Sequence, residues 1–176
     1  MNFVKSYLIC GTLIVLLQAC NSPVQEKPID TDKVIRKSLI ETNKYMRERN
    51  RELIMAFLNR AEWDMTETPT GLWYMIMVQG DGETVQKGKQ VIFAYETRLL
   101  SGKICYSADT LTPKKIVVGK GNIETGLEEG LLMLREGSRA RFIIPPYLAH
   151  GNFGDSQNIP GSAVLITEIQ VLEVRR

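Results

Sequence analysis

The stretch GLEEGLLMLREGSRARFIIPPYLAHG, residues 126–151, decides the fold of this chain. Three leucines on one helical face and a closing glycine predict a helix over residues 123–137. The β-forming residues that follow predict a strand from Arg139 to Ile144. The pair Pro145–Pro146 cannot extend the hydrogen-bond ladder of a sheet, so it ends this strand at the sheet rim.

The polar and small residues of the predicted helix have structural interpretations. Thr125 can cap its N-terminus. Glu128 and Glu129 lie in the first turn, where the helix dipole favours negative charge, and this explains them better than a catalytic acid/base pair. Gly130 would let the helix backbone come close to a neighbouring element.

Further strands are predicted on both sides of this stretch. Turn residues such as Gly80–Gly82 and Ser101–Gly102 separate runs rich in aromatic and β-branched residues. These runs, with the strand described above, predict strands over residues 72–78, 90–99, 115–118, 139–144 and 163–174. Short connections favour an antiparallel sheet, and one short helix among the strands indicates an α+β fold in which the sheet curls around it.

A long helix is predicted before the sheet, over residues 31–65. No Gly or Pro occurs between Thr31 and Trp63, and apolar residues recur at helical spacing at Ile35, Leu39, Met46, Leu53 and Phe57. Two interpretations stay open: a spacer or dimerisation helix, or a helix that packs along its own domain.

The first thirty residues differ from the rest. Lys5 precedes an apolar run that is too short to span a membrane stably, which is typical of a secretory signal. The ending LQAC resembles the lipobox of bacterial lipoproteins, which implies a signal peptide over residues 1–19 and a diacylglycerol on Cys20. The alternative is an ordinary signal peptide with an incidental cysteine. Residues 20–30 are interpreted as a flexible tether.

Composition narrows the function classes. The 176 residues are 44% hydrophobic and 24% charged, which suits one globular domain with extensions. A net charge of +2 without a dense Lys/Arg stripe gives no indication of nucleic-acid binding. If Cys10 is removed and Cys20 is lipidated, Cys105 stands alone, so no intramolecular disulfide is expected. We interpret Cys105 as a buried small residue rather than a reactive thiol.

Several blocks of sequence, in order, resemble FKBP-type peptidyl-prolyl isomerases. GLEEGLLMLREGSRARFIIPPYLAHG resembles the core signature, and the flanking blocks are TGLWYMIMVQGDG, VIFAYETRLLSGKICYS and NIPGSAVLITEIQVLEV. The resemblance covers a domain over residues 70–175. Together with the lipobox and the preceding helix, the stretch PPYLAHGNFGD is similar to the gliding-motility-associated FKBP lipoproteins.

This resemblance implies a fold and an activity. The fold is an antiparallel half-barrel sheet wrapped around one short helix and preceded by a long N-terminal helix. The activity is prolyl cis-trans isomerisation in an apolar pocket, without metal, cofactor or covalent intermediate. The implied substrates are proline-containing exported polypeptides. The implied location is the periplasmic side of the bacterial outer membrane, reached through the N-terminal lipid.

The resemblance also assigns site residues. Matching positions of the family pocket are Tyr95, Ile123, Glu124, Leu127, His150 and Ile159. Glu124 would act through its backbone N–H, which is expected to hold the substrate carbonyl. His150 is expected at the pocket mouth as a hydrogen-bonding residue, with plain surface as the alternative.

Several positions depart from the family pattern. Cys105 and Tyr106 stand where Phe and Asp are usual, Lys114 stands where Phe is common, and Thr167 replaces another Phe. We count Cys105, Tyr106 and Thr167 as further candidate substrate-binding residues, together with Phe153. Tyr106 and Phe153 would compensate for the missing aromatic residues. A binding or chaperone module in an envelope assembly, with weak or no catalysis, is therefore an alternative function. A weaker third one is a structural lipoprotein whose long helix is the working part.

Overall fold

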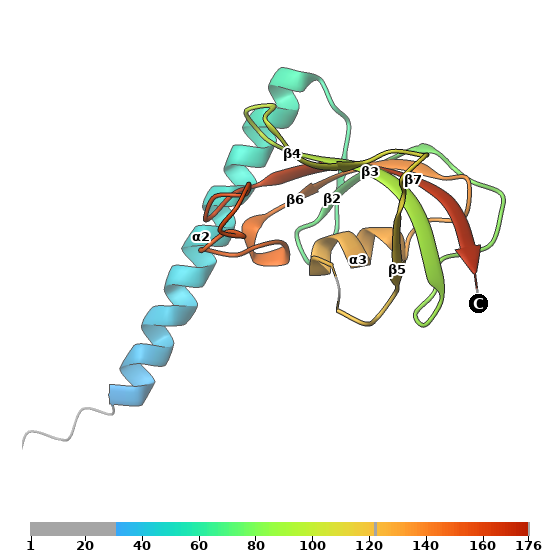
Figure 1. Ribbon diagram of the computed structural model, residues 1–176. Helices are drawn as coiled ribbons and strands as arrows, with labels where there is room; N and C mark the ends of the chain where they lie inside the picture. The colour runs from blue at the N-terminus through green and yellow to red at the C-terminus, as the bar shows by residue number, and fades with distance from the viewer. Residues whose placement is uncertain (1–30, 122, 176) are drawn as a thin grey trace, which may run out of the picture. The chain divides into compact units, whose positions relative to one another are not determined.

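A computed structural model describes residues 31–121 and 123–175 (Figure 1). The predicted signal peptide, Cys20 and the tether lie outside the described residues. The elements, in chain order, are α2 (Thr31–Ala61), β1 (Thr66–Glu67), β2 (Trp73–Val78), β3 (Gln90–Leu99), β4 (Ile104–Ala108), β5 (Lys114–Val117), α3 (Thr125–Leu131), β6 (Arg139–Ile144), the 3-10 turn η1 (Pro146–Leu148) and β7 (Leu165–Arg175).

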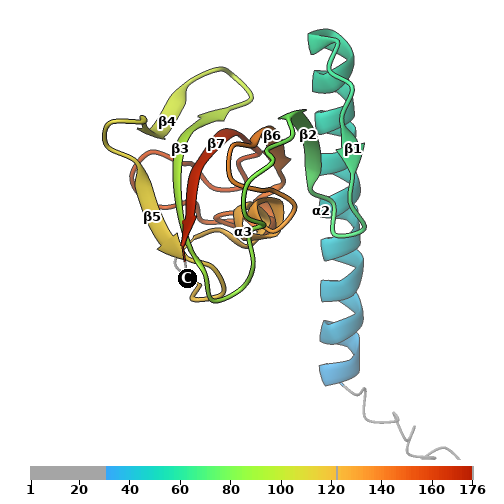
Figure 2. The same ribbon diagram turned by 90° about the vertical axis from the view of Figure 1, so that its right-hand side faces the viewer.

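The strands form one antiparallel sheet in the order β1-β2-β6-β7-β3-β4, and β5 also pairs with β3. Figures 1 and 2 show this sheet curving over the short helix α3. The half-barrel expected around one short helix is therefore confirmed. The strand β6 ends at Ile144, directly before the two prolines, as predicted.

The main core lies between the curved sheet and α3. Alternate residues of β6, such as Phe142 and Ile144, point to this side and are fully buried with Leu131 and Leu134. Gly130 is required here, because a Cβ at this position would lie 2.7 Å from the Phe142 ring. Gly130 therefore allows α3 to pack closely against β6 on the concave side of the sheet.

Helix α3 is shorter than the prediction of residues 123–137. It covers Thr125–Leu131, and the next backbone N–H groups, of Met133 and Leu134, bond three residues back in tight turns. Thr125 is the first helical residue, and the N-cap is Glu124, without a side-chain cap bond. The leucine spacing continued past the helix because these turns keep Leu134 in the core.

The chain divides into two units, residues 1–40 and residues 41–176. Helix α2 begins in the first unit and ends in the second. The described part of the first unit is helical, and Ile35, Leu39 and Ile40 are more than half exposed there. Among the described residues, no helix is long and apolar enough to cross a membrane.

Within the second unit, the C-terminal part of α2 packs on the sheet. Ile54 and Leu58 are buried against Trp73, Ile143 and Ile166. The neighbours of Ile143 and Ile166 along their strands face the main core, so this second cluster covers the opposite face of the sheet. The segment from Asn50 to Leu58 therefore packs on its own domain, which is one of the two interpretations left open by the sequence.

The predicted apolar stripe of α2 was wrong at Leu53, whereas Phe57 does pack against the buried cluster. Leu53 is 49% exposed, whereas Ile54 is 1% exposed. The buried face runs through Asn50, Ile54 and Leu58, which are spaced by four residues. The helix also ends at Ala61 rather than at residue 65, because Glu62 adopts a left-handed backbone conformation.

Candidate active site

A cavity of about 510 Å³ opens on the side of the sheet that faces α3. It lies between β3, the edges β4 and β5, the start of α3, the end of η1 and the flap, which we define as residues 151–161. Its lining consists of Tyr95, Thr97, Tyr106, Lys114, Gly121, Ile123, Glu124, Ala149, His150, Asp155 and Gln157. Aromatic, apolar and charged groups therefore share one pocket.

The strands place the wall residues. Tyr95 and Thr97 are two residues apart on β3, so their side chains point to the same side of the sheet. Thr97 lies opposite Tyr106 on β4, and Lys114 at the start of β5 lies opposite Phe93 on β3. The register of β3 with its two partners thus gathers these side chains around one opening.

The flap is held on the cavity by Asp155. Its Oδ1 accepts hydrogen bonds from the N–H groups of Gln157, Asn158 and Ile159 at 2.8–3.0 Å. Its Oδ2 accepts a hydrogen bond from the Tyr106 hydroxyl. The Tyr106 hydroxyl, with help from the three N–H groups, holds the pKa of Asp155 well below its usual range. The flap is therefore tied to β4 by a carboxylate that stays charged.

Glycine gives the flap its close turn. Gly154 has a φ of +73°, and a Cβ at this position would collide with the backbone carbonyl of Ile159. Only glycine fits such a conformation beside another backbone segment. The flap has no regular secondary structure, but it is a compact loop held by its own internal contacts.

The cavity mouth is bridged by His150 and Glu124. The Nε2 atom of His150 lies 2.9 Å from Oε1 of Glu124, within hydrogen-bond distance. His150 follows η1, and Glu124 precedes α3, so the contact joins two segments that are 26 residues apart. The structure thus places His150 in the cavity lining, within hydrogen-bond distance of Glu124, a partner that the sequence did not predict.

Tyr95 is one of two aromatic residues in the cavity wall, with Tyr106. Its ring packs against Phe93 with centroids 5.8 Å apart, and the ammonium of Lys114 lies 5.1 Å from the Tyr95 ring centroid. Burial, and secondly the charge of Glu124, raises the pKa of the Tyr95 hydroxyl. This hydroxyl is therefore a neutral hydrogen-bond donor at physiological pH.

The structure brings five of the predicted site residues together: Tyr95, Tyr106, Ile123, Glu124 and His150 all line the cavity. Leu127 and Ile159 are 2% and 3% exposed and belong to the main core, so they are not part of the lining. Tyr106 thus supplies an aromatic group at a position where the family pattern has none.

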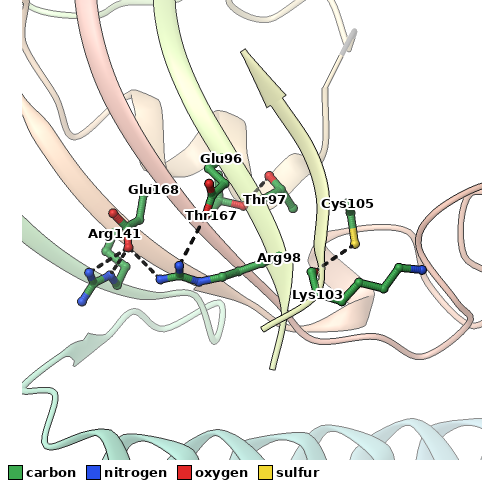
Figure 3. Close-up of polar contacts among 8 residues, drawn as sticks. All are labelled: Glu96, Thr97, Arg98, Lys103, Cys105, Arg141, Thr167 and Glu168. Carbon is green, nitrogen blue, oxygen red and sulfur yellow. Dashed lines mark hydrogen bonds and ion pairs between the residues drawn. The ribbon is translucent and has the colours of Figure 1, made fainter. Parts of the chain in front are cut away.

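Three further predicted residues lie outside the lining. The Cys105 thiol is buried and donates to the carbonyl of Lys103 (Figure 3). It also donates to the carbonyl of Asn158, and its pKa is raised mainly by burial. Thr167 is buried, and its hydroxyl lies 3.0 Å from that of Thr97 (Figure 3). Phe153 is 92% exposed and lines a separate groove together with Leu99 and Lys103. Phe153 therefore does not replace the missing aromatic lining.

Sequence reasoning missed several lining residues: Thr97, Gly121, Ala149, Asp155 and Gln157, and it noted Lys114 only as a departure from the family. Two signals were available. Thr97 follows from strand alternation once Tyr95 is placed. Asp155, before three polar residues, has the pattern of an Asx turn, in which a carboxylate accepts from the backbone ahead of it. Among the described residues, no cluster of His, Cys, Asp or Glu could hold a metal ion.

Comparisons with known proteins agree with this geometry. The sequence profile of the FKBP-type peptidyl-prolyl cis-trans isomerases matches residues 81–172. The "Probable FKBP-type peptidyl-prolyl cis-trans isomerase FkpA" of Neisseria meningitidis is 29% identical over 137 residues, which are 77% of this chain and 50% of the relative. "Peptidyl-prolyl cis-trans isomerase FKBP10" of Mus musculus is 36% identical over 91 residues, 51% of this chain and 16% of the relative. The chain thus spans half or less of the length of these relatives.

Two solved structures share the fold. "Crystal structure of AtFKBP13" superposes with a TM-score of 0.60 at 26% identity and covers 63% of this chain and 98% of the neighbour. A peptidyl-prolyl cis-trans isomerase from Pseudomonas syringae pv. tomato superposes with a TM-score of 0.62 at 21% identity, over 73% and 96% of the two chains. The antiparallel sheet and the short helix of this chain are thus shared with structures of this kind.

Proposed function

We propose, since this chain belongs to the FKBP-type peptidyl-prolyl cis-trans isomerase family, that it catalyses cis-trans isomerisation of Xaa-Pro bonds in the cavity beside Tyr95. The proposal rests on where the cavity lies in the sequence. The residues matched by the family profile, 81–172, contain the whole lining of the cavity.

The chemistry asks little of the lining residues. The barrier, ~18–20 kcal/mol, comes from the partial double bond of the C–N linkage, and rotation through the twisted state forms no new covalent bond. A site accelerates the rotation when it binds the twisted amide better than either planar form. The Tyr95 ring and Ile123 offer apolar surface for the proline ring, and water is displaced when the ring enters.

The substrate carbonyl needs a donor that is already in place. Glu124 directly precedes α3, and its backbone N–H makes no hydrogen bond with any acceptor among the described residues. We propose that it binds the carbonyl before the proline and fixes the peptide in the cavity. The contact between the Glu124 side chain and His150 holds this segment at the mouth.

The cellular setting is a proposal from the sequence. The lipobox ending at Cys20 supports a lipid-anchored protein on the periplasmic side of a bacterial outer membrane, acting on proline-containing exported polypeptides. Uncatalysed prolyl isomerisation takes tens of seconds, which makes a catalyst useful during folding there. Dimerisation through residues 31–65 is a further proposal, supported by the exposed apolar residues at the start of α2.

The direct test is cis-trans exchange of a short Phe-Pro peptide, followed by NMR with the full-length protein in detergent. We expect accelerated exchange with the wild type. Tyr95→Ala should lose most of the acceleration while it keeps the circular dichroism of the folded protein. Wild-type protein that is folded but leaves the exchange rate at its uncatalysed value would refute catalysis.

A second function is favoured by the charged lining. Lys114, Glu124 and Asp155 all line the cavity. Catalysis by binding the twisted amide would be favoured by an apolar lining instead. A binding or chaperone module of an envelope assembly, with weak or no catalysis, would tolerate these groups. Saturable binding of the same peptide without faster exchange would support this second function.

A further inference from the structure

The charged side chains of the cavity differ in whether they already form hydrogen bonds or ion pairs within the protein. Both oxygens of Asp155 accept hydrogen bonds, from three backbone N–H groups and from Tyr106. One oxygen of the Glu124 carboxylate, Oε1, lies 2.9 Å from Nε2 of His150. These two carboxylates therefore hold the flap and the mouth in place.

Lys114 is the exception. Its side chain is partly buried, its ammonium lies 5.1 Å from the Tyr95 ring centroid, and it forms neither an ion pair nor a hydrogen bond with any described residue. An ammonium over an aromatic face is held there by the ring quadrupole, and its three donors stay available. The cavity thus presents a positioned cation whose donors meet no acceptor in the part of the chain that the structure describes.

We propose that Lys114 makes the site selective for polypeptides that carry an acidic residue directly beside the isomerised proline. This inference rests on the proposed function, in which the proline ring binds beside Tyr95. A proline in that place brings the side chains of its sequence neighbours to the cavity edge, beside the ammonium of Lys114. A carboxylate there gains a charge-assisted hydrogen bond that a neutral or basic side chain cannot form.

The strand offers a matched control. Lys115 is the next residue of β5, is exposed, and points to the other face of the sheet because side chains alternate along a strand. It is not part of the cavity lining. Lys114→Glu and Lys115→Glu change the net charge of the protein equally, so any difference between them reports the position of the charge.

The test compares six short peptides with the full-length protein. Glu, Gln or Lys stands directly before or directly after the proline, and both peptide ends are blocked, so the Glu side chain is the only carboxylate. The quantity measured is the ratio of kcat/KM between each Glu peptide and its Gln counterpart, from NMR exchange at low salt. We expect a ratio of about three to five for the wild type at one or both positions, the size of a partly exposed ion pair.

Lys114→Glu should reverse this ratio to below one and favour the Lys peptides, and Lys115→Glu should leave it as in the wild type. Added salt should reduce the wild-type ratio, because exposed charges are screened. Equal ratios for the wild type and Lys114→Glu would overturn the inference, as would a wild-type preference for the Lys peptides, which would mean that Glu124 and Asp155 dominate the field. The Gln peptides separate the two proposals, because their exchange measures isomerisation without any contribution of charge.

Discussion

Replacing Ile54 by alanine should destabilise the whole isomerase domain, although Ile54 belongs to the long helix that precedes it. Ile54 is 1% exposed and packs in the cluster with Trp73, Ile143 and Ile166 on the sheet face opposite α3. The part of the helix around Ile54 would thus belong to the same folded unit as the sheet.

The magnitude follows from the atoms that are removed. Ile→Ala deletes three buried carbons, which is about 2.4 kcal/mol at ~0.8 kcal/mol per buried methylene. The cavity left behind raises the total toward the usual range of about 2–5 kcal/mol, and the better helix propensity of alanine returns only a few tenths. We therefore expect a loss of about 3 kcal/mol in the free energy of unfolding.

The assay is urea unfolding followed both by tryptophan fluorescence and by far-ultraviolet circular dichroism. Trp73 lies in the same buried cluster as Ile54, so its fluorescence reports this face of the sheet. A loss of 3 kcal/mol corresponds to a Tm decrease of roughly 6–12 °C for a protein of this size. Both signals should shift together, because one cooperative unit is expected to unfold.

The control is the neighbouring residue of the same helix. Leu53 is 49% exposed, so Leu53→Ala should cost less than about 1 kcal/mol. If the two variants lost the same stability, or if Ile54→Ala left the sheet transition unchanged while helix signal was lost earlier, the reasoning would be refuted. Residues 41–61 would then fold separately from the sheet.

Three further outcomes are expected. Thr167→Val should cost about 1–3 kcal/mol by urea unfolding because it leaves the buried Thr97 hydroxyl without its partner, and the double Thr→Val variant should regain most of that. Tyr106→Phe should raise the pKa of Asp155 toward its ordinary value in an NMR titration. The stability that this carboxylate gives the wild type is present above about pH 4 and is lost as pH falls through its lowered pKa. On acidification the variant should therefore lose less free energy of unfolding than the wild type does. Gly130→Ala should lower Tm despite its better helix propensity, because its Cβ would meet a core ring at 2.7 Å.

Much of the fold could be predicted because local signals and core packing agree there. β3 and β6 have the predicted bounds, since both begin and end at turn residues or prolines. The helix ends were less predictable, because the apolar period does not stop where the hydrogen-bond pattern changes. The turns after Leu131 keep Leu134 in the core, so the sequence pattern continues beyond the helix.

The buried face of α2 could not be predicted for a related reason. Both Leu53 and Ile54 are apolar, and either could begin a stripe at helical spacing. The choice is made by the sheet, whose outer face offers Trp73 and Ile166 to one of them. The sheet itself is assembled from segments distant in sequence, so the periodicity of the helix alone contains no information on this choice.

The site shows why departures from a family pattern are hard to interpret one residue at a time. Tyr106 stands where the family usually has Asp, and read alone it suggests a lost polar contact. In the structure its hydroxyl bonds to Asp155 on the flap, so a contact between strand and flap exists with the carboxylate on the flap side. His150 and Glu124 likewise have meaning as a pair across the mouth. These two contacts hold the flap and the mouth in position without the missing aromatic rings. The groups of the cavity that are left to bind a substrate are then the Tyr95 ring, for the proline, and the Lys114 ammonium, for the residues next to it.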